Sequence, residues 1–533
     1  MKRKVRLLCV SHLSTLTGAE TSLYLLLKNL DRERFEPVVV FPNDGPLRQR
    51  VGDLDIPTVV SPIVWWTESA EPGGGYLGWL ATARHRVERL AAIIEEHAID
   101  LVHTNVSVVA DGALAALAKR VPHIWHVRET LSKFPTIKPF LPLAMVYALI
   151  GKLSERVVVV TEAVKRDVGQ GVDGTKLVVL HNGIDVEDFV AQSRDTPFIP
   201  SPTVEPGGLR VGALGSFIPE KGFDTLVEAA ALVRKTMPHV QFHVAGPVGD
   251  VAYVQRLQHR VDERALGSAF FLHGFCEDVV SFIRSMDVMA VPSRIEAMSR
   301  VTLESMALSK PIVATHSGEA EDVIVDGESG LLVPVENPQA MAEAIGRLLR
   351  EPAWAASLGV RALERVKACY PMERHVGRFE SICLEALEQF TPSQAPGRAD
   401  IIGLLEVFER VGNGAQQIFR GLEEAVIDKD RHIQNLEAVR EHLDQALQER
   451  DTHVENLEAA RDAMQKQVGQ LEQVVEDKDT QIQNLEAAQE RTRQLADRLT
   501  KDVHDKDAHI RNLEAMIAEF EDLFEHIHRE LAT

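Results

Sequence analysis

Two successive series of short apolar runs constrain what this chain can fold into. Within each series the runs are rich in β-branched residues and alternate with amphipathic stretches, which is typical of a parallel sheet with helices on both faces. The first series begins at Val5–Val10 and the second at Arg210–Leu214, and a segment rich in proline and glycine, Pro197–Gly208, separates them. Because such sheets bind ligands beyond the carboxyl ends of their strands, the pattern predicts two doubly wound α/β domains that face a cleft.

The remaining sequence supplies the domain boundaries. A second linker follows the second series, and no proline occurs after Pro396. In chain order we predict a Rossmann-like domain over 1–196, a second over 208–373, a helix over 374–390 that returns to the first domain, a linker over 391–399 and a helical tail over 400–533.

The tail carries a heptad pattern that predicts a left-handed coiled coil. The tetrapeptide Asn-Leu-Glu-Ala begins at four positions whose spacings are multiples of seven, namely Asn435, Asn456, Asn484 and Asn512. Apolar residues keep one register from Ile433 at position a and Leu436 at position d, although charged residues such as Arg440 and Lys478 also fall on the seam. A lone charged helix or a partly disordered tail is the alternative.

Composition excludes several classes of function. A formal net charge of -21 argues against nucleic-acid binding, which needs a basic face. The four cysteines form no CxxC pair, so we expect buried, reduced thiols in a cytoplasmic protein. No apolar run reaches the roughly 18 residues of a transmembrane helix. The nearest candidate, Pro139–Ile150, is expected to be a core helix rather than a membrane-surface helix, so membrane contact would be peripheral at most.

Two glutamates, Glu296 and Glu304, lie on either side of a predicted strand-to-helix junction. The amino end of a helix that begins near Ser299 can hold a diphosphate, with Arg294 and Arg300 close by. A carboxylate at either end of that anion site can accept strong hydrogen bonds from sugar hydroxyls. The pair therefore fits a nucleotide sugar, whereas an ordinary exposed helix glutamate is the alternative for Glu304.

Two other strand ends carry glycine turns. Gly18 follows the first strand near a helix start, and its turn matches neither a GxGxxG nor a Walker A pattern. Lys221, in the turn that begins at Gly215, can place a point charge on a phosphate, and a surface lysine is the alternative.

The segment Asp53-Leu-Asp55 superficially resembles a metal-binding DxD motif, but we expect a solvated turn there and no metal or other cofactor.

Taken in order, these elements resemble the GT-B glycosyltransferases of family 4, the retaining "glycosyl transferases group 1", over roughly residues 1–390. The most specific element is the Glu-x7-Glu of Glu296 and Glu304. Further matching segments are Thr17-Gly-Ala-Glu20, Trp125-His-Val-Arg128, His181-Asn-Gly-Ile-Asp185, the turn from Gly215 to Gly222, and Leu272-His-Gly-Phe275.

The resemblance implies roles for individual residues. Glu304 would hold the ribose hydroxyls, Glu296 would contact the transferred sugar and Lys221 would neutralise the diphosphate. Backbone N–H groups near Gly18 and in the donor loop, which comprises Ala297, Met298, Ser299 and Arg300, would assist Lys221. Gly274 and Phe275 would lie by the base, and His126 would reach the sugar as a catalytic residue beside Glu296 and Lys221. Asn182 is expected near the cleft, and Arg128 is either a ligand-binding residue or the ion-pair partner of Glu129.

Two positions depart from the family pattern. The family usually has an arginine where this chain has Ser216, and we expect Arg300 or Arg294 to compensate for the missing charge. The family's Glu-Gly-Phe-Gly is here Glu296-Ala-Met-Ser299, so the loop lacks both glycines. These differences bear on which nucleotide sugar is the donor, and they bear less on the fold.

The resemblance implies retaining transfer of a sugar from a nucleotide-diphosphate donor to a glycan or lipid-linked acceptor, in bacterial surface polysaccharide synthesis. A sugar-nucleotide epimerase or a phosphorylase is a second enzyme class, against which the Glu-x7-Glu element argues. A catalytically weak scaffold that acts through its coiled coil is a third possibility. The tail, over 420–530, is expected to form homo-oligomers or to dock on another glycan-assembly protein, at the inner face of the cytoplasmic membrane.

Overall fold

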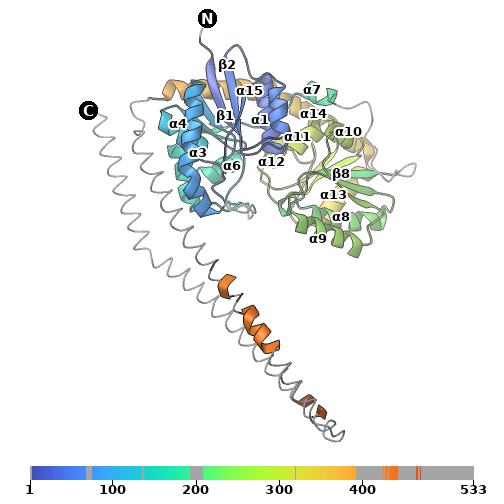
Figure 1. Cartoon of the computed structure of the whole chain (residues 1–533). Helices are drawn as coiled ribbons and strands as arrows, with labels where there is room; N and C mark the ends of the chain where they lie inside the picture. The colour runs from blue at the N-terminus through green and yellow to red at the C-terminus, as the bar shows by residue number, and fades with distance from the viewer. Residues whose placement is uncertain are drawn as a thin grey trace. The chain divides into compact units, whose positions relative to one another are not determined.

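A computed structural model describes residues 3–67, 75–134, 137–192, 208–318 and 320–391, together with short helical pieces between 424 and 469. The chain divides into two units, Met1–Gln416 and Gln417–Thr533. The first unit contains two parallel sheets with helices around each, so the predicted pair of doubly wound domains is confirmed (Figure 1).

The N-terminal sheet has seven parallel strands in the order β3-β2-β1-β4-β5-β6-β7. The strands are β1 (Val5–Val10), β2 (Phe35–Phe41), β3 (Thr58–Val60), β4 (Leu101–Thr104), β5 (His123–Val127), β6 (Arg156–Val159) and β7 (Leu177–Val179). The helices are α1 (Gly18–Asn29), α2 (Pro46–Gly52), α3 (Tyr76–Glu96), α4 (Asp111–Lys119), α5 (Leu143–Lys152), α6 (Glu162–Val168) and α7 (Val186–Ala191).

The second sheet has six parallel strands in the order β10-β9-β8-β11-β12-β13. The strands are β8 (Arg210–Leu214), β9 (Gln241–Ala245), β10 (Phe270–His273), β11 (Val288–Val291), β12 (Ile312–Thr315) and β13 (Leu331–Val333). The other elements are the short 3-10 helix η1 (Pro219–Lys221) and the helices α8 (Phe223–Thr236), α9 (Val251–Glu263), α10 (Val279–Arg284), α11 (Arg300–Ala307), α12 (Ala320–Val323), α13 (Pro338–Arg350), α14 (Pro352–Cys369) and α15 (Met372–Gln389).

Strand order reverses direction between β1 and β4 in the first sheet and between β8 and β11 in the second. At such a point the connections leave on opposite sides of the sheet and open a crevice at the carboxyl ends of the strands. Gly18 begins the helix that follows β1, and the turns after β8 and β11 carry Gly215 and Glu296, respectively. The topology therefore brings the predicted motifs to the two crevices.

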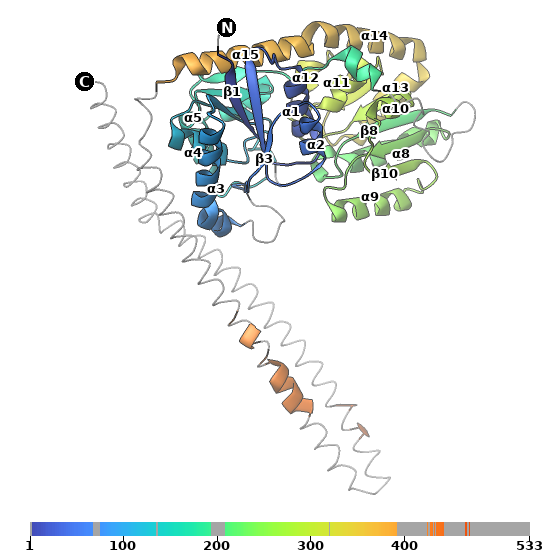
Figure 2. The same cartoon turned by 45° about the horizontal axis from the view of Figure 1, so that its top comes forward.

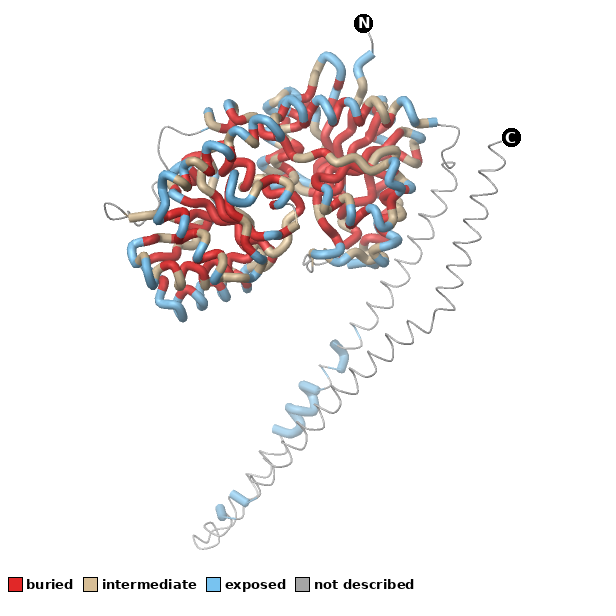
Figure 3. The backbone as a smooth tube through the Cα atoms, turned by 180° about the vertical axis from the view of Figure 1, so that it is seen from behind, coloured by how far each residue is buried: buried red, intermediate tan, exposed pale blue. Residues whose placement is uncertain are grey.

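The strands are buried on both faces, as parallel sheets require. Along β1, Leu7 and Cys9 pack into one core cluster, and Leu8 and Val10 pack into another, because successive side chains point to opposite faces. Figure 3 shows the buried residues gathered in the interior of both domains. Burial also raises the pKa of the Cys9 thiol to about 12, so this cysteine is unreactive.

The final helices cross from the second domain to the first (Figure 2). Helix α14 packs against α11, and α15 packs against α1 and β5. The backbone N–H of Ile184 donates to Tyr370 O at 2.9 Å, and the N–H of Met372 donates to Ile184 O at 3.2 Å. The segment just before α7 is therefore hydrogen-bonded to the segment that joins α14 to α15.

Buried contacts fix α15 to the N-terminal domain. Phe379 is fully buried in the cluster that holds Leu7 and Cys9. Glu380 is also buried and accepts hydrogen bonds from the backbone N–H of Asp31 and from Arg34 Nη1, both at 2.9 Å. A buried carboxylate is tolerated here because both of its oxygens are paired.

Two sequence predictions concern burial. The apolar run at 139–150 contains most of α5, whose Val146, Tyr147 and Ile150 are buried, so the predicted core helix is confirmed. The prediction of four buried thiols is confirmed for Cys9 and Cys383 and is wrong for Cys276, which is half-buried, and for Cys369, which is exposed at the end of α14. No helix in the described ranges is both long and apolar enough to cross a bilayer.

The described pieces of the tail are helical. The longest covers residues 433–441, and its seam residues Ile433 and Leu436 are exposed within the single chain. Most of the heptad register lies outside the described residues, so the coiled coil stays a prediction.

Candidate active site

A cavity of about 640 Å³ lies between the two domains of the first unit. Its N-terminal wall comes from the turn before α1, from α1 itself, and from α2 and α7. Its other wall comes from the turns after β8, β9, β10 and β11 and from α11. Figures 1 and 2 show α1 and α11 at this junction.

The structure brings ten of the predicted site residues to this cavity. They are Gly18, Gly215, Ser216, Lys221, Phe275, Glu296, Met298, Ser299, Arg300 and Glu304. The other predicted residues do not line it, namely Gly274, Ala297, His126, Asn182, Arg128 and Arg294. The ten residues come from both domains, so the cavity is the candidate active site.

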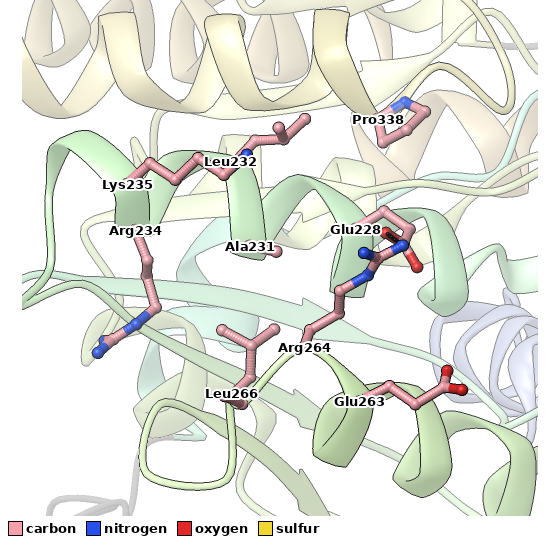
Figure 4. A pocket seen from close by; sticks show the side chains of 10 residues that line it. Glu228, Ala231, Leu232, Arg234, Lys235, Glu263, Arg264, Leu266 and Pro338 are labelled. Carbon is pink, nitrogen blue, oxygen red and sulfur yellow. Dashed lines mark ion pairs between the residues drawn. The ribbon is translucent and has the colours of Figure 1, made fainter.

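A second hollow, of about 590 Å³, lies between α8, α9 and the start of α13 (Figure 4). Charged side chains surround it, and Glu228 pairs with Arg264 at 2.8 Å and with Arg260 at 3.4 Å. None of the predicted site residues lies there. Its surface is therefore an ordinary network of ion pairs between helices.

The turn after β8 is held against the loop after β11 by a close backbone contact. Gly222 has a φ of +64°, and a Cβ atom there would lie 2.1 Å from Pro292 O, so only glycine fits without strain. The backbone N–H of Arg294 donates to Glu220 O at 2.7 Å across the same contact. These contacts fix Lys221 beside the Glu-x7-Glu loop.

Lys221 and Glu296 form an ion pair in the cavity. The distance from Lys221 Nζ to Glu296 Oε2 is 2.5 Å, and Ser293 Oγ donates to the same carboxylate oxygen at 3.0 Å. The side chains are 24% and 12% exposed, respectively, so water screens the pair less than it screens an open surface pair. A cation and a carboxylate thus lie together in the cleft, as the sequence pattern predicts.

Helix α11 holds the second glutamate. Ser299 caps the helix by accepting a hydrogen bond from the N–H of Thr302 at 3.2 Å, which places the helix start where the sequence predicts it. One turn further on, Glu304 Oε1 accepts from Arg300 Nη2 at 3.0 Å. Arg300 and Glu304 therefore both face the cleft from the first turns of α11.

Buried Arg128 bridges two loops below the cleft. Its Nε donates to Asn105 Oδ1 at 3.0 Å, and its Nη1 donates to Asn182 Oδ1 at 3.0 Å. The backbone N–H of Asn182 in turn lies 3.0 Å from the sulfur of Met298 in the other domain. Burial lowers the pKa of Arg128 to about 10, and the nearby Glu129 carboxylate opposes this shift.

His126 does not reach the cavity in this structure. Its ring is fully buried at the end of β5, with Nδ1 at 3.4 Å from His103 Nε2 and 3.3 Å from Arg128 Nη2. Burial lowers the pKa of His126 well below its usual range, so the imidazole is neutral at neutral pH. His126 does not line the cavity in this arrangement of the domains, and its contact with the sugar stays a prediction.

Arg294 is also engaged elsewhere. Its guanidinium pairs with Asp224 and Glu336, each at 2.7 Å. Of the two arginines suggested to compensate for Ser216, only Arg300 lines the cleft.

Sequence reasoning missed much of the N-terminal wall. Tyr24 and Lys28 of α1 and Asp188 and Gln192 at α7 all line the cavity. These residues belong to no motif, and only the packing of α1 beside α7 places them there. The sequence also gave no role to the fully buried Glu20, whose Oε1 lies 2.8 Å from His12 Nδ1.

Two protein-family models match the chain. Residues 16–188 match the model described as Glycosyltransferase Family 4, and residues 208–351 match the model described as Glycosyl transferases group 1. Together the matches span more than half of the sequence, one in each Rossmann-like domain. The chain is a glycosyltransferase.

Relatives of this glycosyltransferase span archaea and bacteria. It is 28% identical over 278 residues to an uncharacterized glycosyltransferase of Methanocaldococcus jannaschii, over 51% of this chain and 72% of that protein. It is 28% identical over 208 residues to the lipopolysaccharide core biosynthesis mannosyltransferase LpcC of Rhizobium leguminosarum bv. viciae, over 38% of this chain and 58% of that protein.

A solved structure shows the same fold. The crystal structure of Anabaena HepE, in complex with UDP and glucose, matches the enzyme with a TM-score of 0.59 at 21% identity. The match covers 71% of this chain and 98% of that chain. The GT-B arrangement of two Rossmann-like domains is therefore confirmed.

The contact at Gly222 generates a prediction about stability. Gly222→Ala would place a Cβ atom against Pro292 O at a positive φ, so we expect the free energy of unfolding to fall by roughly 1–3 kcal/mol. Urea unfolding of the full chain measures the change. Gly267→Ala is the matched control, because nothing lies within 4 Å of a Cβ atom there. Equal stability of the two variants would contradict the proposed tight contact.

Proposed function

We propose that this glycosyltransferase moves a sugar, with retention of anomeric configuration, from a nucleoside-diphosphate sugar to a glycan or lipid-linked acceptor. The observation that carries the proposal is the grouping of Lys221, Glu296, Arg300 and Glu304 in one interdomain cavity. The cations suit a diphosphate, and the carboxylates suit the hydroxyls of the two sugar rings that flank it.

The geometry supports one orientation of the donor. Lys221 and the amino end of α11 would take the diphosphate, with Glu304 on the ribose and Glu296 on the transferred sugar. Phe275, which is 55% exposed beside Gly274 at the end of β10, offers an aromatic face to the base. Gly18 faces this side of the cleft from the N-terminal domain.

In the reaction, the bond between the anomeric carbon and the diphosphate oxygen breaks and the acceptor hydroxyl bonds to that carbon on the same face. The hydroxyl proton passes to the leaving diphosphate. Lys221 and Arg300 would stabilise the negative charge that develops there, and we propose that they do so without a metal ion or other cofactor. We assign no sugar contact to His126 in this arrangement, because its ring does not line the cavity.

Surface polysaccharide synthesis is the setting that the relatives support. LpcC is named as a mannosyltransferase of lipopolysaccharide core synthesis, and HepE was crystallised with UDP and glucose. Both facts favour a hexose donor and a bacterial envelope glycan as acceptor. A lipid-linked acceptor would bring the cytoplasmic enzyme to the inner face of the membrane.

The donor site is tested by thermal stability with UDP, GDP, ADP and their common sugar conjugates. A ligand at about 100 times its dissociation constant adds roughly 2.7 kcal/mol of stability, which raises the melting temperature. We expect one nucleotide to give this shift and Glu304→Gln to abolish most of it. Glu343→Gln, an exposed change on α13, should leave the shift unchanged. No shift with any nucleotide would favour a catalytically weak scaffold that acts through its tail.

We also propose that the tail over 420–530 joins copies of the enzyme or docks it on another glycan-assembly protein. Several active sites held at one growing glycan would raise the effective concentration of acceptor ends. A variant that ends at Ala395 is expected to lose self-association in light-scattering measurements while it keeps nucleotide binding. A truncated protein that stays oligomeric would contradict self-association through the tail.

A further inference from the structure

The charged side chains that line the cleft are largely paired with each other. Ion pairs join Lys221 to Glu296 at 2.5 Å, Arg300 to Glu304 at 3.0 Å and Lys28 to Asp188 at 2.7 Å, measured from side-chain nitrogen to carboxylate oxygen. The lining carboxylates are Asp53, Asp185, Asp188, Glu277, Asp278, Glu296 and Glu304, and they outnumber the lining cations Lys28, Arg50, Lys221 and Arg300.

This charge balance is unusual for a site that takes a diphosphate. An anion that enters meets a surplus of negative charge, and the two cations best placed to bind it, Lys221 and Arg300, already have carboxylate partners. The anion competes with these partners for the two cations. A carboxylate that loses its cation needs a new hydrogen-bond donor, because leaving it partly buried and unpaired costs free energy.

Resting on the proposed function, we propose that Glu296 is a specificity-determining residue that distinguishes the intact donor from its nucleoside-diphosphate product. Glu296 pairs with Lys221 before the donor binds, gives up this pairing when Lys221 contacts the diphosphate, and pairs with Lys221 again once the sugar has been transferred. The exchange therefore favours entry of the nucleotide sugar and departure of the nucleoside diphosphate.

The chemistry of the two ligands explains the difference. With the intact donor, Lys221 gains the phosphate oxygens, and Glu296 gains hydrogen bonds from sugar hydroxyls. With the nucleoside diphosphate alone, Lys221 gains the same phosphate, but Glu296 gains no sugar hydroxyl. Its remaining side-chain donor, among the residues that the structure describes, is the Ser293 hydroxyl. The Glu296 carboxylate and the phosphate, both negatively charged, then face each other in a site where water screens charges poorly.

The surrounding backbone allows this exchange without rearrangement. The N–H of Lys221 donates to Ile218 O at 3.1 Å, and the adjacent Gly222 is locked against Pro292. The ends of the two side chains can therefore separate and rejoin while the turn and the loop stay in place. Ser293 keeps Glu296 oriented toward the cleft, since its hydroxyl donates to the oxygen that Lys221 contacts.

The test compares dissociation constants, measured by titration calorimetry, for UDP against UDP-glucose, GDP against GDP-mannose, and inorganic pyrophosphate. We expect Glu296→Gln to tighten binding of the cognate nucleoside diphosphate and of pyrophosphate about tenfold, which corresponds to 1.4 kcal/mol. Binding of the nucleotide sugar should not tighten, because the variant loses its charge-assisted bond to the sugar. The dissociation constant of the nucleoside diphosphate, divided by that of the nucleotide sugar, should therefore fall about tenfold or more.

Two further variants make the result specific. Asp53→Asn removes a negative charge from the opposite wall of the same cleft without touching Lys221, so its ratio should stay at the wild-type value. Ser293→Ala loosens Glu296 while it keeps the carboxylate, so its ratio should fall less than that of Glu296→Gln. If Glu296→Gln fails to fold, the ratio of dissociation constants measured for Ser293→Ala still tests the inference.

Three outcomes would overturn the inference. One is a nucleoside diphosphate that binds Glu296→Gln no more tightly than the wild type. Another is an equal effect of Asp53→Asn, which would show that only the total charge of the cleft matters. The third is a wild-type enzyme that binds none of these nucleotides, and that result alone would also overturn the proposed function.

Discussion

The close contact between the turn after β8 and the loop after β11 organises the donor side of the cleft. Gly222 lets the backbone of the turn reach Pro292, and the N–H of Arg294 is bonded to Glu220 O. These two strands are neighbours at the point where the strand order reverses, so their connections diverge and leave a crevice. Lys221 and Glu296 project into that crevice from opposite sides of one rigid contact.

The second domain alone forms only half of the cavity. The N-terminal wall depends on the hydrogen bonds between Ile184 and the segment that joins α14 to α15, and on α15, which is anchored by Phe379 and Glu380. Because the domains are linked through this narrow strip and α15, movement there would change the width of the cleft. Such a movement would also alter the contact between Asn182 and Met298, which links the buried Arg128 to the donor loop.

Much of the fold was predictable from the sequence because buried parallel strands leave a strong local pattern. The predicted strands at Val5–Val10 and Arg210–Leu214 match the structure residue for residue. The edge strand β3 leaves no such pattern, because it has three residues and is only partly buried. Glu296 and Glu304 were found because their roles depend on spacing along one local strand-to-helix segment.

Features set by contacts between distant residues were not predictable. Arg294 looked available to a phosphate, but Asp224, which is 70 residues away in sequence, pairs with it. His126 looked like a cleft residue, yet the packing of β4 and α15 buries it with His103 and close to His375. The wall residues Tyr24, Lys28 and Gln192 carry no motif, because only the position of α1 and α7 brings them to the cavity.

The most direct measurement is a crystal structure of the enzyme with its cognate nucleotide sugar. We predict a diphosphate between the turn at Gly215 and the amino end of α11, the ribose on Glu304, and Lys221 moved from Glu296 to the phosphate. A nucleotide bound outside the interdomain cavity, or bound inside it with the ion pair between Lys221 and Glu296 intact, would contradict this account.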